Sequence, residues 1–162
     1  MPLKTKVMDK EGNEKEVVIS KDDGIRKETT LESLGKLRPA FKKDGSTTAG
    51  NSSQVSDGAA AVVLARRSTA AKFGMPILGR FVQYAVKGCP PEIMGIGPAV
   101  AIPELLAKTG KKVSDIDIWE VNEAFASQAV YCVEKLGIDY NKLNPKGGAI
   151  ALGHPLGCTG KD

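Results

Sequence analysis

Hydrophobic positions after residue 57 fall into short runs, and these runs alternate between two kinds of pattern. Residues 77–86 have the pattern of a strand, and residues 116–121 alternate between apolar and polar positions, so both are predicted strands. Three segments have helical character, and each is followed by a glycine that would end a helix: 66–73, 98–108 and 124–136. Strands that alternate with helices predict an α/β fold with buried strands.

The segments before these elements carry weaker signals. Residues 57–65 are a run of small apolar side chains, consistent with either a buried strand or a buried helix. Residues 1–45 are polar and irregular apart from a strand-like run at 17–19 and a turn signal at 22–24, so we expect a loop region there. Pro103 must lie near the first turn of its helix, because a proline in a helix interior removes a hydrogen bond.

The composition is typical of a soluble globular chain, with 41% hydrophobic and 26% charged residues among 162. No apolar run reaches the roughly 18–20 residues of a membrane span, and the first residues lack the apolar centre of a secretory signal. The net charge of +4 is spread with mixed signs, without the basic stripe that nucleic-acid binding requires. A small, acidic, phosphate-bearing ligand suits this modest excess better.

The chain contains three cysteines, Cys89, Cys132 and Cys158, and one histidine, His154. An odd number of cysteines without a secretory signal indicates reduced thiols inside a cell. No two cysteines have C-x-x-C spacing, and a single histidine cannot form a histidine cluster. The sequence therefore predicts no metal site and no permanently bound cofactor.

His154 lies in a glycine-rich segment, residues 147–160, which contains five glycines. Glycines let backbone approach a ligand closely, and Pro155 stiffens the turn that follows the imidazole. His154 could therefore act as a general base or as a hydrogen-bond donor to a developing oxyanion. The alternative is an ordinary histidine in a surface turn, and the residues alone leave both interpretations open.

Two other segments carry polar groups that chemistry could use. Asn122 stands between a predicted strand and a predicted helix, where α/β folds collect their sites. Its amide either holds a water or carbonyl oxygen or caps the helix. Residues 47–58 are typical of either a phosphate-cradling loop or a plain capped turn. Residues 95–98 fail as a dinucleotide motif because the third glycine is missing, and no G-x-S-x-G motif indicates a serine hydrolase.

Four motifs coincide in order and spacing with those of a known family. They are the hydroxyl-rich stretch 48–60, the segment 88–98, the Asn-Glu-Ala-Phe motif at 122–125 and the Gly-His-Pro motif at 153–155. Along nearly its whole length the chain resembles the thiolases, and within them the peroxisomal 3-ketoacyl-CoA branch.

The resemblance implies a mechanism. Thiolases use an amino-terminal cysteine as nucleophile, and a second cysteine near the carboxyl terminus moves the proton of the Claisen step. By resemblance, His154 activates the thiol and helps to form an oxyanion hole, and Asn122 holds a water in the same hole. Coenzyme A is a substrate here, and the family's contacts with it map onto five residues: Arg26, Ala49, Ser53, Ala124 and Phe125.

The resemblance also implies a layered αβαβα fold with two similar halves, of which this chain would hold a part. Residues 1–45 would be the tail of the loop domain, 46–75 the end of the amino-terminal half and 76–162 an incomplete carboxyl-terminal half. The implied function is thiolytic cleavage of 3-ketoacyl-CoA by CoA in fatty-acid β-oxidation. The implied protein is a peroxisomal homodimer, with mitochondrial or cytoplasmic location as alternatives.

Neither catalytic cysteine motif of the family occurs in this sequence. The nucleophile's motif lies upstream of residue 1 in the family, Cys89 stands in a Pro-Pro-Glu segment, and Cys132 lies within a predicted helix. Cys158 adjoins the histidine loop, where family members often have alanine. We therefore expect the isolated chain to be inactive. The competing hypothesis is a non-catalytic remnant that binds CoA or a protein partner.

Overall fold

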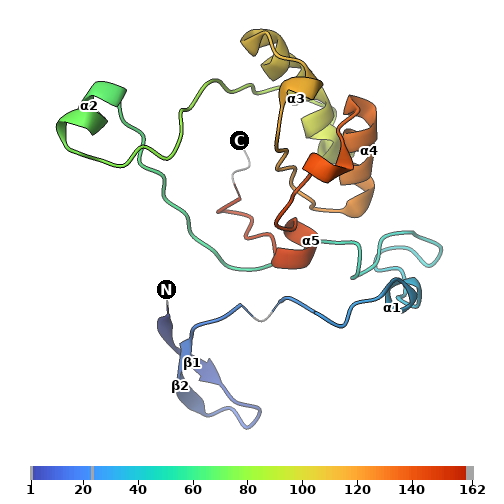
Figure 1. Cartoon of the computed structure of the whole chain (residues 1–162). Helices are drawn as coiled ribbons and strands as arrows, with labels where there is room; N and C mark the ends of the chain where they lie inside the picture. The colour runs from blue at the N-terminus through green and yellow to red at the C-terminus, as the bar shows by residue number, and fades with distance from the viewer. Residues whose placement is uncertain (1, 23, 160–162) are drawn as a thin grey trace.

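The structure is a computed structural model that describes residues 2–22 and 24–159. Its elements in chain order are β1 (Leu3–Met8), β2 (Glu14–Ile19), α1 (Leu31–Gly35), α2 (Arg67–Lys72), η1 (Pro91–Ile96), α3 (Gly97–Thr109), η2 (Val113–Asp115), α4 (Ala126–Leu136), η3 (Tyr140–Lys142) and α5 (Ala149–Leu152), where η marks a 3-10 helix. Helices α3 and α4 pack together, whereas the β1–β2 hairpin and α2 stand away from them on open connections (Figure 1).

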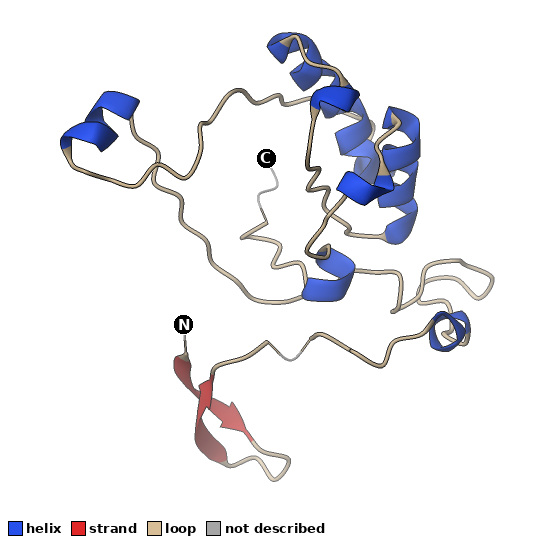
Figure 2. Cartoon of the chain, in the orientation of Figure 1, coloured by secondary structure: helices blue, strands red, loops and turns tan. Residues whose placement is uncertain are grey.

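The sheet of the described residues is an antiparallel hairpin of β1 and β2, in which Leu3 lies opposite Ile19 (Figure 2). The strand expected at residues 17–19 is confirmed within β2. Strand β1 was not predicted, because it is mostly polar and exposed. Its Lys6 pairs with Glu14 across the hairpin at 2.8 Å, and such an exposed pair adds little stability.

The hydrophobic core is built by α3, α4 and the segment that runs between them. Its buried side chains are Trp119, Val121, Val133 and Ile138. Partly buried residues surround this cluster: Ile102, Leu106, Val113, Ile116, Leu136 and Leu143. The core therefore comes from one continuous part of the chain, and it forms the platform on which the segment after Val121 is held.

The three predicted helices are confirmed as α2, α3 and α4. Gly110 ends α3 and Gly137 ends α4, both in the left-handed conformation with φ of 66° and 68°. A glycine adopts this conformation without a Cβ penalty, which is why the sequence signal was reliable. The expected place of Pro103 was wrong: α3 already begins at Gly97, so this proline lies inside the helix.

The two predicted strands at 77–86 and 116–121 are not formed. Residues 77–86 are irregular and pair with no strand in the described part of the chain, and Leu78 is fully exposed. Residues 116–121 make one isolated bridge, between Trp119 and Leu143. A strand exists only through hydrogen bonds to a neighbouring strand. Since residues 24–159 provide no such neighbour, the apolar patterns remain without their expected structure.

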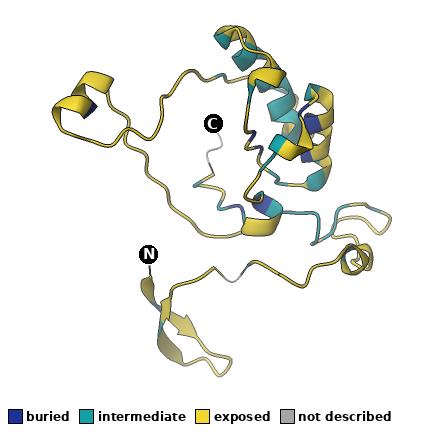
Figure 3. Cartoon of the chain, in the orientation of Figure 1, coloured by how far each residue is buried: buried dark blue, intermediate teal, exposed yellow. Residues whose placement is uncertain are grey.

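The expectation of a buried element at 57–65 was also wrong. This run is irregular and exposed throughout, as the yellow connection in Figure 3 shows. Val62, for example, is 81% exposed. Its small apolar side chains carry the signal of burial, but burial requires a second surface to pack against. The described residues do not place such a surface there.

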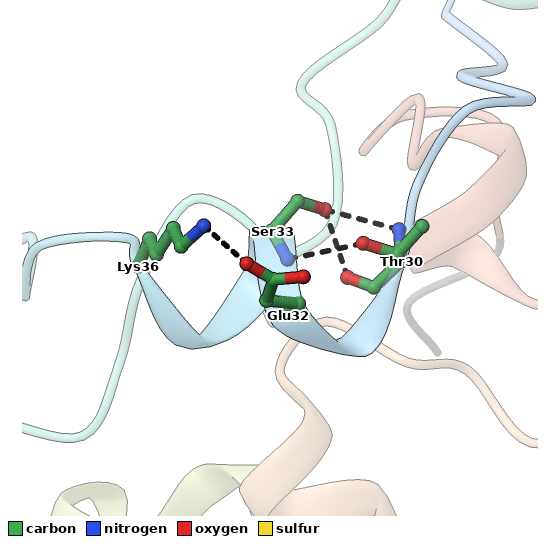
Figure 4. Close-up of polar contacts among 4 residues, drawn as sticks. All are labelled: Thr30, Glu32, Ser33 and Lys36. Atoms are coloured by element: carbon green, nitrogen blue, oxygen red, sulfur yellow. Dashed lines mark hydrogen bonds and ion pairs between the residues drawn. The ribbon is translucent and has the colours of Figure 1, made fainter.

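The expected loop region at 1–45 contains one short helix, α1, besides the hairpin. Thr30 and Ser33 cap it reciprocally, because each backbone amide donates to the other's hydroxyl oxygen, at 3.0 and 3.1 Å (Figure 4). The turn expected at 22–24 includes Asp23, which lies outside the described residues. None of the described helices has the length and apolar character needed to cross a bilayer.

Candidate functional site

The structure brings His154 and Asn122 together. The Asn122 Nδ2 atom lies 3.3 Å from the His154 Nε2 atom, although the residues are 32 positions apart. His154 is only 7% exposed, so the alternative of a surface-turn histidine is overturned. The alternative of Asn122 as a helix cap is wrong too, because the N-cap of α4 is Phe125. Its amide therefore remains available to the imidazole and to a ligand.

The core and α4 hold Asn122 in place. Val121 is buried in the core, so the chain leaves the core one residue before Asn122. The Gln128 Nε2 group on α4 donates a hydrogen bond to the Asn122 carbonyl oxygen at 2.8 Å. The Asn122 backbone is thus bonded to α4. Its side chain is exposed to solvent and contacts the His154 imidazole.

Glu123 ties the Asn122 segment to the helix that precedes the histidine. Its carboxylate accepts hydrogen bonds from Asn144 Nδ2 at 2.9 Å and from the Ile150 amide of α5 at 3.3 Å. Gly148 makes this approach possible, because a Cβ there would collide with the Glu123 carboxyl group. A carboxylate that caps the first turn of α5 also suits the helix dipole. Glu123 therefore fixes where α5 begins.

Asn144 completes this link from the other side. Its Oδ1 accepts from the Val121 amide at 2.8 Å, and its Nδ2 donates to the Val121 carbonyl oxygen at 2.9 Å. Asn144 has a positive φ of 43°, which asparagine tolerates better than most residues. The Asn144 side chain thus satisfies the backbone amide and carbonyl of Val121, as a neighbouring strand would do.

Residues 51–54, which we call the strap, join the two candidate loops. The Ala126 amide donates to the Asn51 carbonyl oxygen and the Ser53 amide donates to the Ala124 carbonyl oxygen, both at 2.9 Å. The His154 amide donates to the Gln54 carbonyl oxygen at 2.8 Å. The strap therefore sets the spacing between the Asn-Glu-Ala-Phe segment and the histidine turn.

The hydroxyl-rich loop that runs into the strap uses most of its polar side chains on itself. The Asn51 Oδ1 accepts from the Thr48 amide at 2.8 Å, and the Ser52 hydroxyl donates to the Thr48 carbonyl oxygen at 2.7 Å. These bonds are those of a plain capped turn. Ser53 differs, because its hydroxyl makes no hydrogen bond to the described residues and remains available to a ligand.

The five residues matched to coenzyme A contacts lie on or near the strap, with one exception. Ser53 and Ala124 are hydrogen-bonded neighbours, Ala49 lies in the preceding loop, and Phe125 packs edge-on against Phe41 with ring centroids 6.3 Å apart. Arg26 stands further out, with an exposed side chain that contacts none of the other four through a hydrogen bond.

Arg26 nevertheless belongs to a segment that is anchored to the strap. The Gln54 Nε2 group donates to the Gly24 carbonyl oxygen at 2.8 Å, two residues before Arg26. A Cβ on Gly24 would lie 2.7 Å from the Gln54 Oε1 atom, so a side chain there would displace the Gln54 amide from its present position. This contact anchors the Arg26 segment to the strap, of which Ser53 is a part.

The cysteines do not supply a nucleophile beside His154. Cys132 is fully buried in α4, and burial raises the pKa of its thiol, which disfavours the thiolate. Cys89 and Cys158 are partly exposed, and the Cys158 amide donates to the Pro155 carbonyl oxygen at 2.8 Å. Across the described residues, no group of three or more histidine, cysteine or acidic side chains could hold a metal ion.

Sequence reasoning missed three residues that organise the site: Thr159, Glu123 and Asn144. Thr159 Oγ1 lies 2.5 Å from His154 Nδ1, and the other two support α5. Thr159 and Glu123 both lie inside motifs that the sequence singled out, but only a three-dimensional arrangement shows their partners. The end of the glycine-rich segment, residues 160–162, lies outside the described residues.

Two family models match this chain. The thiolase N-terminal domain matches residues 1–68, and the thiolase C-terminal domain matches residues 75–162. The rat peroxisomal 3-ketoacyl-CoA thiolase B is 67% identical over 160 residues, which cover 99% of this chain and 38% of the relative. The chain therefore spans well under half the length of the curated relatives that it matches.

Solved structures agree with this match. The dimeric peroxisomal thiolase of Saccharomyces cerevisiae is 58% identical with a TM-score of 0.86, over 96% of this chain and 39% of that chain. A second structure of the yeast protein, described as five α-β-α-β-α layers, is 66% identical with a TM-score of 0.58, over 59% of this chain and 28% of that chain. Human mitochondrial 3-ketoacyl-CoA thiolase in complex with CoA is 51% identical with a TM-score of 0.84, over 88% of this chain and 36% of that chain.

The backbone of the described residues is thus a portion of the layered α/β fold that the sequence predicted, even though the strands expected at 77–86 and 116–121 are not formed. The carboxyl-terminal model covers more than half of the chain, and the matched residues include both Asn122 and His154. On the combined strength of its motifs, its backbone and its relatives, this chain belongs to the thiolase family.

Proposed function

We propose that this chain supplies the histidine–asparagine part of a thiolase active site. As part of a full-length protein it would act in the thiolytic cleavage of 3-ketoacyl-CoA by CoA, which yields acetyl-CoA and a shortened acyl-CoA. The observation that carries the proposal is the contact of Asn122 with the buried imidazole of His154, at 3.3 Å. The match to peroxisomal 3-ketoacyl-CoA thiolases supports the choice of reaction.

The chemistry follows from the two groups. The His154 Nε2 atom takes the proton of a thiol, so that the S–H bond breaks, an N–H bond forms and a thiolate becomes the nucleophile. The imidazolium then carries a proton on Nε2 that can be donated to the thioester oxygen as negative charge develops there. Asn122 holds a water beside the same oxygen. One imidazole thereby serves both proton removal and charge stabilisation in successive moments of the reaction.

The coenzyme A contacts are proposed for Arg26, Ala49, Ser53, Ala124 and Phe125. Ser53 lies in the strap, and Ala124 and Phe125 pair with the strap backbone. Because the strap also holds His154, these three positions suit the pantetheine end of CoA. Arg26 lies further out on an exposed segment, which suits the nucleotide end with its phosphates. This order along the chain's surface matches a ligand that reaches inward from its nucleotide to its thiol.

We further propose that the full-length protein is a peroxisomal homodimer that binds CoA as a substrate and requires no metal or resident cofactor. Peroxisomal relatives and a dimeric yeast structure support this. In this proposal residues 1–45 belong to the loop domain, 46–75 to the amino-terminal half and 76–162 to the carboxyl-terminal half.

A chimera tests the proposed function directly. The 160 aligned residues of the rat peroxisomal thiolase B would be replaced by those of this chain, and cleavage of acetoacetyl-CoA by CoA would be measured. We expect cleavage by the chimera and none by the chain alone, since Cys132 is buried and no other cysteine pairs with His154 in the described residues. A folded dimeric chimera without activity would overturn the proposal. Turnover by the chain alone would contradict the expectation that the nucleophile lies outside these 162 residues.

A further inference from the structure

His154 has a partner at each of its two ring nitrogens, and one of these partners, Thr159, lies outside the motifs at 122–125 and 153–155. The Nδ1 atom lies 2.5 Å from the Thr159 Oγ1 atom, within hydrogen-bond distance. The same Thr159 hydroxyl donates to the Pro155 carbonyl oxygen at 2.8 Å. Thr159 thus connects the imidazole to the backbone of the turn that carries it.

The protons at this contact can be counted. A threonine hydroxyl has one proton and two lone pairs. Since its proton points to the Pro155 carbonyl oxygen, only lone pairs face the His154 Nδ1 atom. A hydrogen bond at Nδ1 then requires that Nδ1 carry the ring proton.

The second contact gives the same answer independently. The atom that faces the His154 Nε2 is the Asn122 Nδ2, which is an amide donor without an acceptor lone pair. A donor at this position requires an unprotonated Nε2. The two contacts lie on opposite sides of the ring and come from separate segments, yet both select the tautomer with the proton on Nδ1.

We propose that Thr159 is a positioning residue that holds His154 in the Nδ1–H tautomer and keeps the Nε2 lone pair directed toward Asn122. The hydrogen bond that one ring nitrogen makes determines which nitrogen carries the proton and which is left to act as a base. In the neutral enzyme Nε2 is therefore ready to take a proton, and this consequence for catalysis rests on the proposed function. When Nε2 becomes protonated, the Nδ1–H bond to Thr159 remains in place, so the ring keeps its orientation through the proton transfer.

The single histidine makes this tautomer directly measurable. In the whole 162-residue chain, labelled with ¹⁵N and free of a polyhistidine tag, long-range ¹H–¹⁵N spectra report one imidazole without any assignment problem. In the neutral ring, we expect a protonated Nδ1 and an unprotonated Nε2 in the unmodified chain. Thr159→Ser keeps the acceptor and should keep this pattern.

Thr159→Val removes the acceptor and keeps the shape of the side chain. The tautomer ratio should shift toward Nε2–H by roughly 2- to 10-fold, the range that one hydrogen bond of ordinary net strength provides. Thr69→Val, on the exposed surface of α2, is the matched control and should leave the ratio unchanged.

An Nε2–H tautomer in the unmodified chain would overturn the proposal, and so would a Thr159→Val variant whose ratio equals that of the unmodified chain. If Thr159→Val loses its fold by circular dichroism, the unmodified chain and Thr159→Ser still decide the outcome. The spectra need neither CoA nor turnover. A chain that shows Nδ1–H but whose chimera lacks activity would therefore contradict the proposed function alone.

Discussion

The backbone amide of His154 donates a hydrogen bond to the carbonyl oxygen of Gln54 at 2.8 Å. One residue earlier, the Ser53 amide donates to the Ala124 carbonyl oxygen at 2.9 Å. The same short strap therefore holds both loops of the candidate site. A displacement of the strap would therefore move His154 and the Asn122 segment together.

Replacement of His154 should affect the rate more than substrate binding. In the chimera with the rat thiolase, His154→Ala should lower kcat by at least about 10²- to 10³-fold, the loss for one oxyanion donor, because the thiol also loses its base. Steady-state kinetics with acetoacetyl-CoA, together with calorimetric titration of CoA, separate the two effects. An unchanged kcat would contradict the role assigned to this imidazole.

Glu123 should stabilise the histidine turn through α5. Glu123→Ala leaves the Ile150 amide without its acceptor and leaves the Asn144 Nδ2 group with the Val121 carbonyl oxygen alone, which should cost about 1–3 kcal/mol of unfolding free energy. Hydrogen exchange at Ile150 should accelerate at the same time. Glu120→Ala, at an exposed position three residues earlier, is the control and should change neither measurement.

Gly153 should not tolerate a side chain. Its φ is 112°, and an added Cβ would lie 2.6 Å from the Ser56 Oγ atom. Gly153→Ala should therefore lower the unfolding free energy by about 1–3 kcal/mol and disturb the His154 resonances. Gly157→Ala, four residues later in the same turn with open space at its Cβ, is expected to leave both unchanged. Equal effects of the two changes would contradict the geometry described for Gly153.

Coenzyme A affinity should depend more on Arg26 than on Ser53. A guanidinium contact with phosphate is charge-assisted, whereas the Ser53 hydroxyl offers one neutral hydrogen bond. Titration calorimetry of CoA into the chimera should show a larger increase in Kd for Arg26→Ala than for Ser53→Ala. Arg38→Ala, another exposed arginine, serves as control. If neither Arg26→Ala nor Ser53→Ala shifts Kd, the proposed CoA contacts are wrong while the family assignment stands.

Stability should decline at alkaline pH through Cys132. Burial raises its folded-state pKa above the ordinary value of 9.0, so the unfolded thiol ionises first. Its contribution is fully present below about pH 9 and is lost as pH rises through the raised pKa. Urea unfolding followed by the fluorescence of Trp119, the single tryptophan, should show this decline. Cys132→Ala should flatten it, and Cys89→Ala, at a partly exposed thiol, should not.

Helices could be predicted from the sequence because their signals are local. The apolar spacing and the glycines at 110 and 137 lie within or beside the helices that they define, and hydrogen bonds within each helix need no distant partner. The strands at 77–86 and 116–121 were predicted from equally clear patterns. They failed because a strand's hydrogen bonds come from elsewhere in the chain, and the described residues do not provide them.

The candidate site shows the same division. His154 and Asn122 were identified from their motifs, and the structure brings them together. Their supports were not predicted, because each one joins segments far apart in sequence. Gln54, whose carbonyl oxygen accepts from the His154 amide, lies 100 positions before it. Asn144 lies 23 positions after Val121, whose backbone it bonds. No local periodicity records such a contact.

The exposed run at 77–86 has a consequence for the behaviour of the isolated chain in solution. Apart from the Tyr84 amide, which donates to the Gln83 Oε1 atom at 3.0 Å, its backbone amides and carbonyls make no hydrogen bond to the described residues, and large side chains such as Leu78, Phe81 and Val82 are exposed. The pattern that predicts a strand at this run also favours its pairing with an identical run of another molecule. As its concentration rises, the isolated chain should therefore aggregate through this run while its core is still folded. The run, rather than the core, should limit the solubility of the chain.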